Sequence, residues 1–427
     1  MKNPIITSIF TADPSAHVWE DGKVYIYASH DMDPARGCDL MDRYHVFSSE
    51  DMVNWVDEGE ILRSDDVSWG RTEGGFMWAP DAAYRNGTYY FYYPHPSGTA
   101  WNDTWKIGVA TSKKPASEFT DQGYITGLGG FAMIDPCVFV DDDNRAYMYY
   151  GGGSKCAGGE LNDDMMSMKH DAIEMEGLED FHEATWVFKR NGIYYLTYSD
   201  NLDGLNQMRY AISDNPLGPW TYKGVFLEPT GCSTSHGSVA EFKGQWYLFY
   251  HNQDISDQGN LRSVCIDYLH FNEDGTIQTV VQTREGGIKP VGPSKAANPN
   301  QIVYAADQAS VHGGAALLSD DQGNAVIGSL NREGAYCQFD GLDGLGGGRT
   351  SIEIRYATEE RLAKINLNVN GEDFSLLNAL STGSLSDYTG ITNLTVPFKA
   401  GAVNSVKLTG GNGELRIASI AVSSFED

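Results

Sequence analysis

Five segments of the chain repeat one pattern of apolar and polar positions. Each begins with a short apolar run, passes through a polar turn that contains Gly or Asn, and ends in an alternating run rich in aromatic residues. The segments are residues 16–30, 81–95, 136–152, 184–200 and 237–252. Alternation on both sides of such a turn is typical of a β-hairpin, so each segment predicts one hairpin.

The turns of these hairpins recur along the chain. The turn residues are Gly22, Gly87, Asn144, Gly192 and Gly244, which are separated by 65, 57, 48 and 52 residues. A period near fifty with one hairpin in each copy is typical of propeller blades. Three further segments, 44–59, 107–123 and 208–224, resemble one another and follow three of the hairpins. The pattern therefore predicts a five-bladed β-propeller that ends near residue 286.

A second domain is expected after the propeller. Residues 294–301 are small and polar, and beyond them the sequence has few aromatic residues. Short alternating runs at 350–357, 363–371, 404–411 and 413–422 predict an antiparallel β-sandwich. We therefore expect an all-β chain, with a propeller over residues 1–293 and a β-sandwich, or jelly roll, over 302–427.

Composition agrees with this fold and limits the partners. The 427 residues include 24 Tyr, 17 Phe and 9 Trp, which suit strands, and 48 Gly, which suit turns. A net charge of −28 argues against nucleic acid and anionic membranes and suits a neutral substrate such as a sugar. No apolar run reaches the length of a membrane span, and the first residues do not form a signal peptide. We expect a cytoplasmic protein, or a secreted one whose signal peptide is absent from this chain.

Two features of the chain resemble metal or redox sites without matching them. The six cysteines, which are Cys38, Cys137, Cys156, Cys232, Cys265 and Cys337, lack CxxC spacing, so we expect free thiols. The acidic run at 141–143 lacks the alternating spacing of an EF-hand loop. It lies at a predicted hairpin turn, so we expect it to be solvated.

Aligning the repeats on their turns places acidic residues at corresponding positions. Asp13, Trp78, Asp135 and Glu183 stand nine residues before the turn, and His236 stands eight before it. If the first strand of each hairpin is the innermost, these side chains gather around one mouth of the central channel. Two carboxyl groups with different pKa values are the working groups of a glycosidase. A propeller lectin that binds sugars without cleaving them is the alternative, although binding a neutral sugar does not require three acids.

Residues 3 to about 286 resemble glycoside hydrolase family 43. The matching motifs are "FTADPSAHVWEDGKVYIYASHD" at 10–31, "MWAPD" at 77–81, "IDPCVFVDDDNRAYMYYGG" at 134–152 and "RNGIYYLTYSD" at 190–200. The resemblance implies an inverting glycosidase on a five-bladed propeller. It makes Asp13 the general base, Glu183 the general acid and Asp135 the carboxylate that tunes and orients Glu183. Family members often have Glu-Gly-Pro at the acid, where this chain has Glu183-Ala184-Thr185.

The same resemblance extends to binding residues. It implies that Trp78 forms a wall of the sugar subsite and that Arg262 reaches substrate hydroxyl groups. It also implies that His236 lies on the propeller axis beside a structural calcium ion, most of whose ligands are waters. The expected activity is release of terminal α-L-arabinofuranose, β-D-xylose or both from hemicellulose fragments. Exo-galactanase or arabinanase specificity on this fold is an alternative, and so is a retaining fructan hydrolase, whose Asn-Asp-Pro-Asn signature is absent.

The C-terminal region resembles a family 6 carbohydrate-binding module. The resemblance lies in residues 313–339 and in the closing strands. It implies aromatic residues on a binding face, for which Tyr336 and Tyr388 are the candidates. The late Asn of such modules is missing, so a structural role is the alternative to sugar binding.

Overall fold

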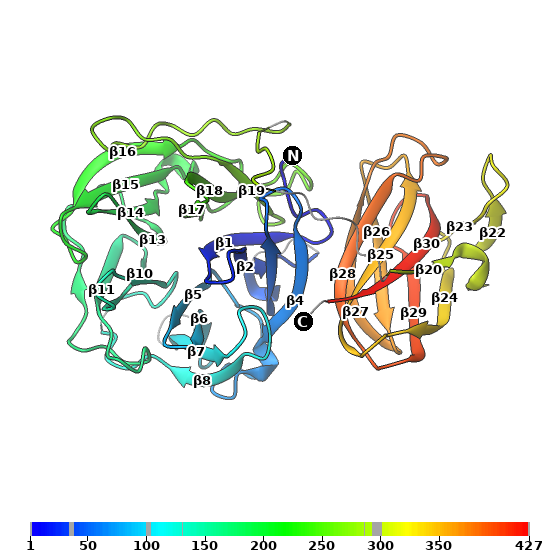
Figure 1. Cartoon of the computed structure of the whole chain (residues 1–427), viewed down its shortest axis with the longest axis horizontal. Helices are drawn as coiled ribbons and strands as arrows, with labels where there is room; N and C mark the ends of the chain where they lie inside the picture. The colour runs from blue at the N-terminus through cyan, green and yellow to red at the C-terminus, as the bar shows by residue number, and fades with distance from the viewer. Residues whose placement is uncertain are drawn as a thin grey trace. The chain divides into compact units, whose positions relative to one another are not determined.

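The computed structural model describes residues 2–33, 38–99, 104–129, 131–285, 287–292 and 301–425. By its internal contacts the chain falls into two compact units (Figure 1). The first comprises Met1–Ile6, Thr11–Val56 and Glu60–Pro293, and the second comprises Thr7–Phe10, Asp57–Gly59 and Ser294–Asp427. The linker expected over 294–301 lies outside the described residues except for residue 301.

Within the described residues the first unit has five antiparallel sheets, four of four strands and one of three. They are β1 (Thr11–Val18), β2 (Val24–His30), β3 (Arg43–Ser49) and β4 (Val56–Arg63); β5 (Asp81–Arg85), β6 (Thr88–Pro96), β7 (Trp105–Ser112) and β8 (Thr120–Tyr124); β9 (Cys137–Val140), β10 (Ala146–Gly152), β11 (Lys155–Glu160) and β12 (Ile173–Glu174); β13 (Glu183–Arg190), β14 (Ile193–Ser199), β15 (Met208–Ser213) and β16 (Thr221–Leu227); and β17 (Ser238–Phe242), β18 (Gln245–Asn252) and β19 (Ser263–Tyr268). Each predicted hairpin forms the first two strands of one sheet, so the five-bladed propeller is confirmed.

The first strand of each blade is the innermost. These strands contact one another in the closed order β1, β5, β9, β13, β17 and back to β1, and in Figure 1 they lie nearest the centre of the ring. The second strands carry tyrosines that are fully buried, among them Tyr27, Tyr92, Tyr149 and Tyr195. Their rings fill the space between blades, and their hydroxyl groups donate hydrogen bonds to the backbone. The hydroxyl of Tyr27, for example, donates to the carbonyl of Pro115 at 2.6 Å.

The start of the chain joins the first blade to the last. The backbone N–H of Ile5 donates to the carbonyl of Val264 at 2.8 Å, and that of Thr11 donates to the carbonyl of Arg262 at 2.9 Å. Ile5 and Thr11 therefore both lie beside the start of β19. This closure brings Arg262 next to the first residues of β1, although the two are about 250 positions apart in the sequence.

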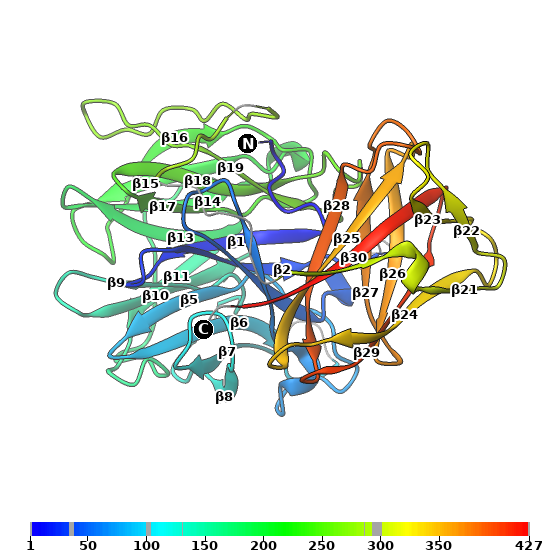
Figure 2. The same ribbon diagram turned by 45° about the vertical axis from the view of Figure 1, so that its right-hand side comes forward.

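The second unit is a β-sandwich of two sheets, visible in Figures 1 and 2. One sheet contains β22 (Ala316–Ser319), β23 (Ala325–Gly328), β30 (Leu415–Ser424), β25 (Gly348–Thr358) and β28 (Gly390–Phe398), with β20 (Ile302–Ala305) beside β30. The other contains β21 (Ser310–His312), β24 (Tyr336–Asp343), β29 (Ala402–Gly410), β26 (Leu362–Val369) and β27 (Glu372–Leu380). All four strands expected from the alternating runs are present.

Helical structure is minor in the described part of the chain. It consists of short 3-10 helices: η1 (Cys38–Leu40), η2 (Ser64–Asp66), η3 (Leu202–Gly204) and η4 (Ala306–Gln308). None of the described helices is long and apolar enough to cross a membrane. The five cysteines whose side chains are described are Cys137, Cys156, Cys232, Cys265 and Cys337; all are free thiols, as expected, and all are buried.

One expectation differs from the structure in detail. Asp141 is buried rather than solvated, because Lys189 donates to its Oδ1 at 2.7 Å and Tyr194 donates to its Oδ2 at 2.5 Å. In the β-sandwich, Tyr336 stacks on His312 with ring centroids 4.6 Å apart. Tyr388 lies in the loop between β27 and β28, and a sugar-binding role for the two tyrosines stays a prediction.

Candidate active site

Asp13 lies in a bulge near the start of β1, where the central strands meet. The pairing of β1 with β2 shifts register between Ala12 and Ser15, and Asp13 has a φ of 51°. Aspartate tolerates this left-handed conformation better than most residues. Asp13 is 5% exposed, its Oδ2 accepts a hydrogen bond from Ser29 Oγ at 2.8 Å, and its Oδ1 accepts one from Arg262 Nη1 at 2.8 Å. The bulge therefore holds a buried carboxylate against an arginine of the last blade.

Arg262 uses all of its guanidinium N–H groups within the chain. Nη1 donates to Asp13 and, at 2.9 Å, to Thr234 Oγ1. Nε and Nη2 donate to the two oxygens of Asp31 at 2.9 and 2.8 Å, and Nη2 also lies 3.8 Å from Met41 Sδ. Asp31 accepts the backbone N–H of Arg262 as well, at 2.7 Å. One buried arginine thus joins two buried carboxylates in a fixed geometry.

The charges in this cluster set the protonation of Asp13. Burial is the largest single influence and would raise the pKa of Asp13, but Arg262, together with His251, His236 and the hydrogen bond from Ser29, outweighs burial and lowers that pKa below its ordinary value. For Asp31 burial is the stronger influence, so its pKa is raised despite the arginine. Burial lowers the pKa of Arg262, but its two carboxylate partners outweigh this and raise it. Asp13 is therefore held as a carboxylate, the form that can accept a proton.

His251 fixes the backbone of Asp13. Its Nδ1 accepts the backbone N–H of Asp13 at 3.1 Å, so the ring proton is on Nε2, which donates to the carbonyl of Thr234 at 2.8 Å. Burial lowers the pKa of His251 to about 3. A neutral imidazole with one defined tautomer therefore links β18 to β1.

Asp135 lies two residues before β9 and, like Asp13, has a positive φ, of 53°. Its Oδ2 accepts the backbone N–H of Ala184 at 2.7 Å, and its carbonyl accepts the hydroxyl of Thr185. Both partners directly follow Glu183, so Asp135 anchors the backbone that presents Glu183. The same Oδ2 lies 3.8 Å from Nδ1 of His236. The structure therefore brings Asp135, Glu183 and His236 together.

Glu183, at the start of β13, is the most exposed of the three carboxylates. Its side chain is 18% exposed, against 7% for both Asp13 and Asp135. Burial raises the pKa of Glu183, and the charge of Asp13 raises it further although His182, 3.6 Å away, opposes this. Burial also raises the pKa of Asp135, with the charge of Glu183 as the second cause. Asp135 and Glu183 can therefore hold a proton between them at a pH at which Asp13 is already ionised.

The alignment of the repeats on their turns is wrong by one residue at Glu183. Glu183 pairs with Ser199 of β14 and is the last paired residue before the register shift of its strand. In the first blade the residue in this place is Ala12, which pairs with Ser29, rather than Asp13. The residue that matches Asp13 is Ala184, which also has a positive φ, of 68°. The mismatch arises because the turn between β1 and β2 is longer than the turn between β13 and β14. By strand pairing, Glu183 therefore corresponds to the residue before Asp13.

Trp78 is near the site but not on a strand. It precedes β5, is half-buried, and packs on Trp105 with ring centroids 4.3 Å apart. Its carbonyl accepts the hydroxyl of Tyr44 at 2.6 Å. Burial raises the pKa of Tyr44, and the charges of Asp13 and Asp135 raise it further, which shows that this phenol lies close to both carboxylates. The half-exposed indole and the carboxylates thus belong to one region.

His236 is a weak candidate for a metal ligand. Burial lowers its pKa to about 4, so its ring is neutral and its nitrogens are available. Among the described residues, however, no group of three or more His, Cys, Asp or Glu side chains is placed to hold a metal ion. Calcium prefers several oxygen ligands. The side chains present therefore do not fit a calcium ion held mainly by the protein.

Sequence reasoning missed four residues that support Asp13 and Arg262. They are Ser29, Asp31, Thr234 and His251. A signal existed in the repeats, because their second strands end in polar residues: "SHD" at 29–31, "SD" at 199–200 and "HN" at 251–252. In two blades the acidic residue of this group binds an arginine, Asp31 with Arg262 and Asp200 with Arg209 at 2.6 Å. The strand ends therefore carry the supporting groups.

The sequence profile described as "Glycosyl hydrolases family 43" matches residues 1–277. The chain belongs to glycosyl hydrolase family 43. This family 43 glycosidase is 36% identical over 333 residues to Xylosidase/arabinosidase 43A of Humicola insolens, covering 65% of this chain and 98% of that protein.

Solved structures of the family are similar as well. A GH43 β-xylosidase/α-arabinofuranosidase from a compost microbial metagenome, in complex with xylotriose, is 36% identical with a TM-score of 0.59 and covers 65% of this chain and 96% of that one. An arabinoxylan arabinofuranohydrolase from Bacillus subtilis, in complex with cellotetraose, is 27% identical with a TM-score of 0.60 and covers 98% of this chain and 96% of that one. The second similarity thus includes the β-sandwich.

Proposed function

We propose that this family 43 glycosidase releases terminal α-L-arabinofuranose, β-D-xylose or both from hemicellulose-derived saccharides, with inversion at the anomeric carbon. The printed names of its relatives, xylosidase/arabinosidase and arabinoxylan arabinofuranohydrolase, support these sugars. The net charge of −28 also favours neutral saccharides over acidic ones.

One observation carries the proposal: the pKa values of Asp13 and Glu183 are displaced in opposite directions. Arg262 lowers the pKa of Asp13 against the effect of burial, while burial raises the pKa of Glu183. Two carboxyl groups with separated pKa values match the base and the acid of a glycosidase. A sugar-binding lectin has no need for this separation.

In the proposed reaction Asp13 accepts a proton from a water molecule as the water oxygen bonds to the anomeric carbon. Glu183 donates its proton to the glycosidic oxygen as the bond from that oxygen to the anomeric carbon breaks. An inverting enzyme of this kind holds the two carboxyl groups roughly 6.5–9.5 Å apart, with room for the water. Asp135 acts as a positioning residue, because it binds the backbone after Glu183 and its charge is coupled to that of Glu183.

Arg262 and Trp78 keep the roles of predicted binding residues. The half-exposed indole of Trp78 offers a ring face on which the apolar face of a sugar can stack. All guanidinium N–H groups of Arg262 already have acceptors in the chain. A substrate hydroxyl that contacts Arg262 would therefore share an N–H group with an acceptor of the chain. The second role of Arg262 is to keep Asp13 ionised.

A panel of nitrophenyl glycosides tests the proposal. We expect turnover of the α-L-arabinofuranoside, the β-D-xyloside or both, and much lower turnover of β-D-galactosides. Asp13→Asn should remove a contribution of roughly 10²–10⁴-fold from general base catalysis. Glu183→Gln should be equally damaging for xylobiose but milder for nitrophenyl glycosides, because nitrophenolate leaves without a proton. Binding of the sugars without turnover would instead favour the lectin.

A further inference from the structure

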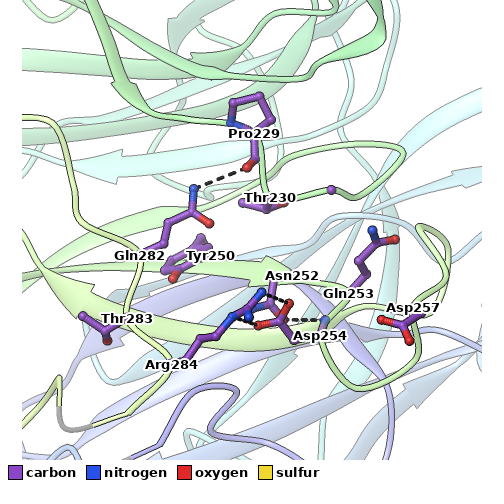
Figure 3. Close-up of a pocket in the computed structure, with 11 residues that line it drawn as sticks. Pro229, Thr230, Tyr250, Asn252, Gln253, Asp254, Asp257, Gln282, Thr283 and Arg284 are labelled. Carbon is purple, nitrogen blue, oxygen red and sulfur yellow. Dashed lines mark hydrogen bonds and ion pairs between the residues drawn. The ribbon is translucent and has the colours of Figure 1, made fainter.

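A polar pocket of about 400 Å³ lies in the first unit (Figure 3), and none of the three carboxylates lines it. Its walls come from three parts of the chain: residues 229–231 after β16, the end of β18 with the loop 252–257, and residues 282–284. The volume falls within the usual range of small-molecule sites, roughly 300–1,000 Å³. None of the residues expected from the sequence to bind substrate lines this pocket.

The pocket and Asp13 lie on opposite faces of β18. His251, which binds the backbone of Asp13, is flanked on this strand by Tyr250 and Asn252, and both flanking residues line the pocket. Successive side chains of a strand point to opposite faces. A ligand in the pocket would therefore be a different sugar unit, or a different molecule, from the one bound at the carboxylates.

The lining is hydrogen-bonding and carries no unpaired cation. Arg284 is held by Asp254 in a two-contact ion pair, with Nε 3.0 Å from Oδ2 and Nη2 3.3 Å from Oδ1. A second acid, Asp257, also lines the pocket. The residual negative charge disfavours phosphate, sulfate or uronic acid groups.

Amide groups supply the donors and acceptors that a neutral ligand needs. At the edge of the pocket the side-chain amide of Gln282 donates to the carbonyl of Glu228 at 2.9 Å. This hydrogen bond joins the wall that contains Gln282 to the segment that precedes Pro229. The backbone carbonyl of Gln253 accepts N–H groups within its own loop, whereas its side-chain amide makes no hydrogen bond to the described residues. In Figure 3 Gln253 and Gln282 lie on opposite sides of the pocket.

We propose that this pocket is a second saccharide-binding site, which holds a neutral pentose unit of the polysaccharide whose terminal sugars the carboxylates remove. The identity of the sugar rests on the proposed function. Converging amide groups without an unpaired cation match the hydroxyl groups of a neutral sugar. The site would hold the substrate chain, or a second chain, without taking part in bond cleavage.

Isothermal titration of the full chain with xylotriose tests this site. We use the Asp13→Asn background, which prevents hydrolysis during the titration. We expect two binding events per chain. Adding Gln253→Ala should weaken one of them about tenfold, the equivalent of one lost neutral hydrogen bond, and adding Gln282→Ala as well should abolish it. Gln258→Ala, an exposed amide of the same loop that does not line the pocket, is the matched control and should change neither event.

Three outcomes would overturn the proposal. They are a single binding event, a second event that Gln253→Ala leaves unchanged, and a second event that only glucuronic-acid-substituted xylotriose produces. Nitrophenyl glycoside turnover, measured separately with Asp13 intact, should not change in Gln253→Ala. Normal turnover without a second site would refute the pocket alone. A Gln253-dependent second site without any turnover would refute the proposed reaction alone.

Discussion

Replacing Arg262 by methionine should damage both stability and the pH profile of catalysis. The substitution keeps a long apolar side chain and removes the one cation between Asp13 and Asp31. Both carboxylates are almost completely buried, at 5% and 2% exposure, so water cannot replace the arginine. One or both must then take up a proton or remain as unpaired buried charges.

The size of the effect follows from the contacts. An Arg262 nitrogen lies 2.8 Å from an oxygen of each carboxylate. At an effective dielectric constant of about 20, each such contact corresponds to a gross attraction of roughly 6 kcal/mol. The cost of burying the charges offsets most of this attraction, and removing one partner of a buried pair costs about 3–5 kcal/mol of net stability. A loss of that size can approach the whole stability of a domain, so Arg262→Lys, which keeps the charge without the fork, is the milder companion variant.

The sign of the pH dependence distinguishes this cause from a general packing defect. In the wild type the pKa of Asp13 is lowered, so its contribution to stability is present above the ordinary carboxyl pKa and is lost as the pH falls. Without Arg262, burial raises the pKa of Asp13, so stability is retained at low pH and lost as the pH rises. The deficit of Arg262→Met relative to wild type should therefore be larger at pH 8 than at pH 5. The acidic limb of kcat/KM should move to higher pH, because the base must lose its proton.

Urea unfolding at both pH values and the pH profile of kcat/KM on a nitrophenyl glycoside measure these effects. Arg209→Met is the matched control, because Arg209 forms a comparable buried pair with Asp200 that does not contact Asp13. It should lose stability and leave the acidic limb unchanged. An unmoved acidic limb in Arg262→Met, or an equal deficit at the two pH values, would contradict the assigned role of the arginine.

Three other predictions concern neighbouring residues. Asp135→Asn removes a charge beside Glu183, so the alkaline limb of kcat/KM should shift to lower pH with a loss of rate, and an unchanged profile would argue against the positioning role. Ala184→Gly should raise the free energy of unfolding by about 0.5–1 kcal/mol, because the position has a positive φ, whereas Ala211→Gly in β15 should lower it by a similar amount. If calcium binds beside His236, dialysis against EDTA should lower Tm or activity, and calcium should restore it; no change in either would exclude a required ion.

The blades could be predicted from the sequence because each hairpin is a local structure. Alternation and a turn residue identify it without knowledge of any distant contact. Asp13 and Asp135 were found because each stands nine residues before its hairpin turn, and both have the same left-handed backbone conformation. Glu183 was found despite an alignment that is displaced by one residue, since turn lengths differ between blades and a count from the turn does not follow strand pairing.

The partners of the supporting residues could not be predicted because their contacts are distant in sequence. Asp31 and Arg262 are separated by 231 positions, and Asp13 and His251 by 238. Nothing near Asp31 in the sequence indicates a buried arginine partner. Asp141 illustrates the same limit, because its burial depends on Lys189 in the next blade. Repeats reveal equivalent positions, but closure of the ring decides which of them touch.

The stereochemistry of the reaction tests the central claim most directly. Hydrolysis of nitrophenyl β-D-xyloside can be followed by proton NMR from the first minutes, before mutarotation mixes the anomers. If Asp13 activates water and never bonds to the sugar, α-D-xylose should appear first. Early β-D-xylose, or a trapped glycosyl ester on Asp13, would contradict the inverting mechanism and assign Asp13 the role of a nucleophile.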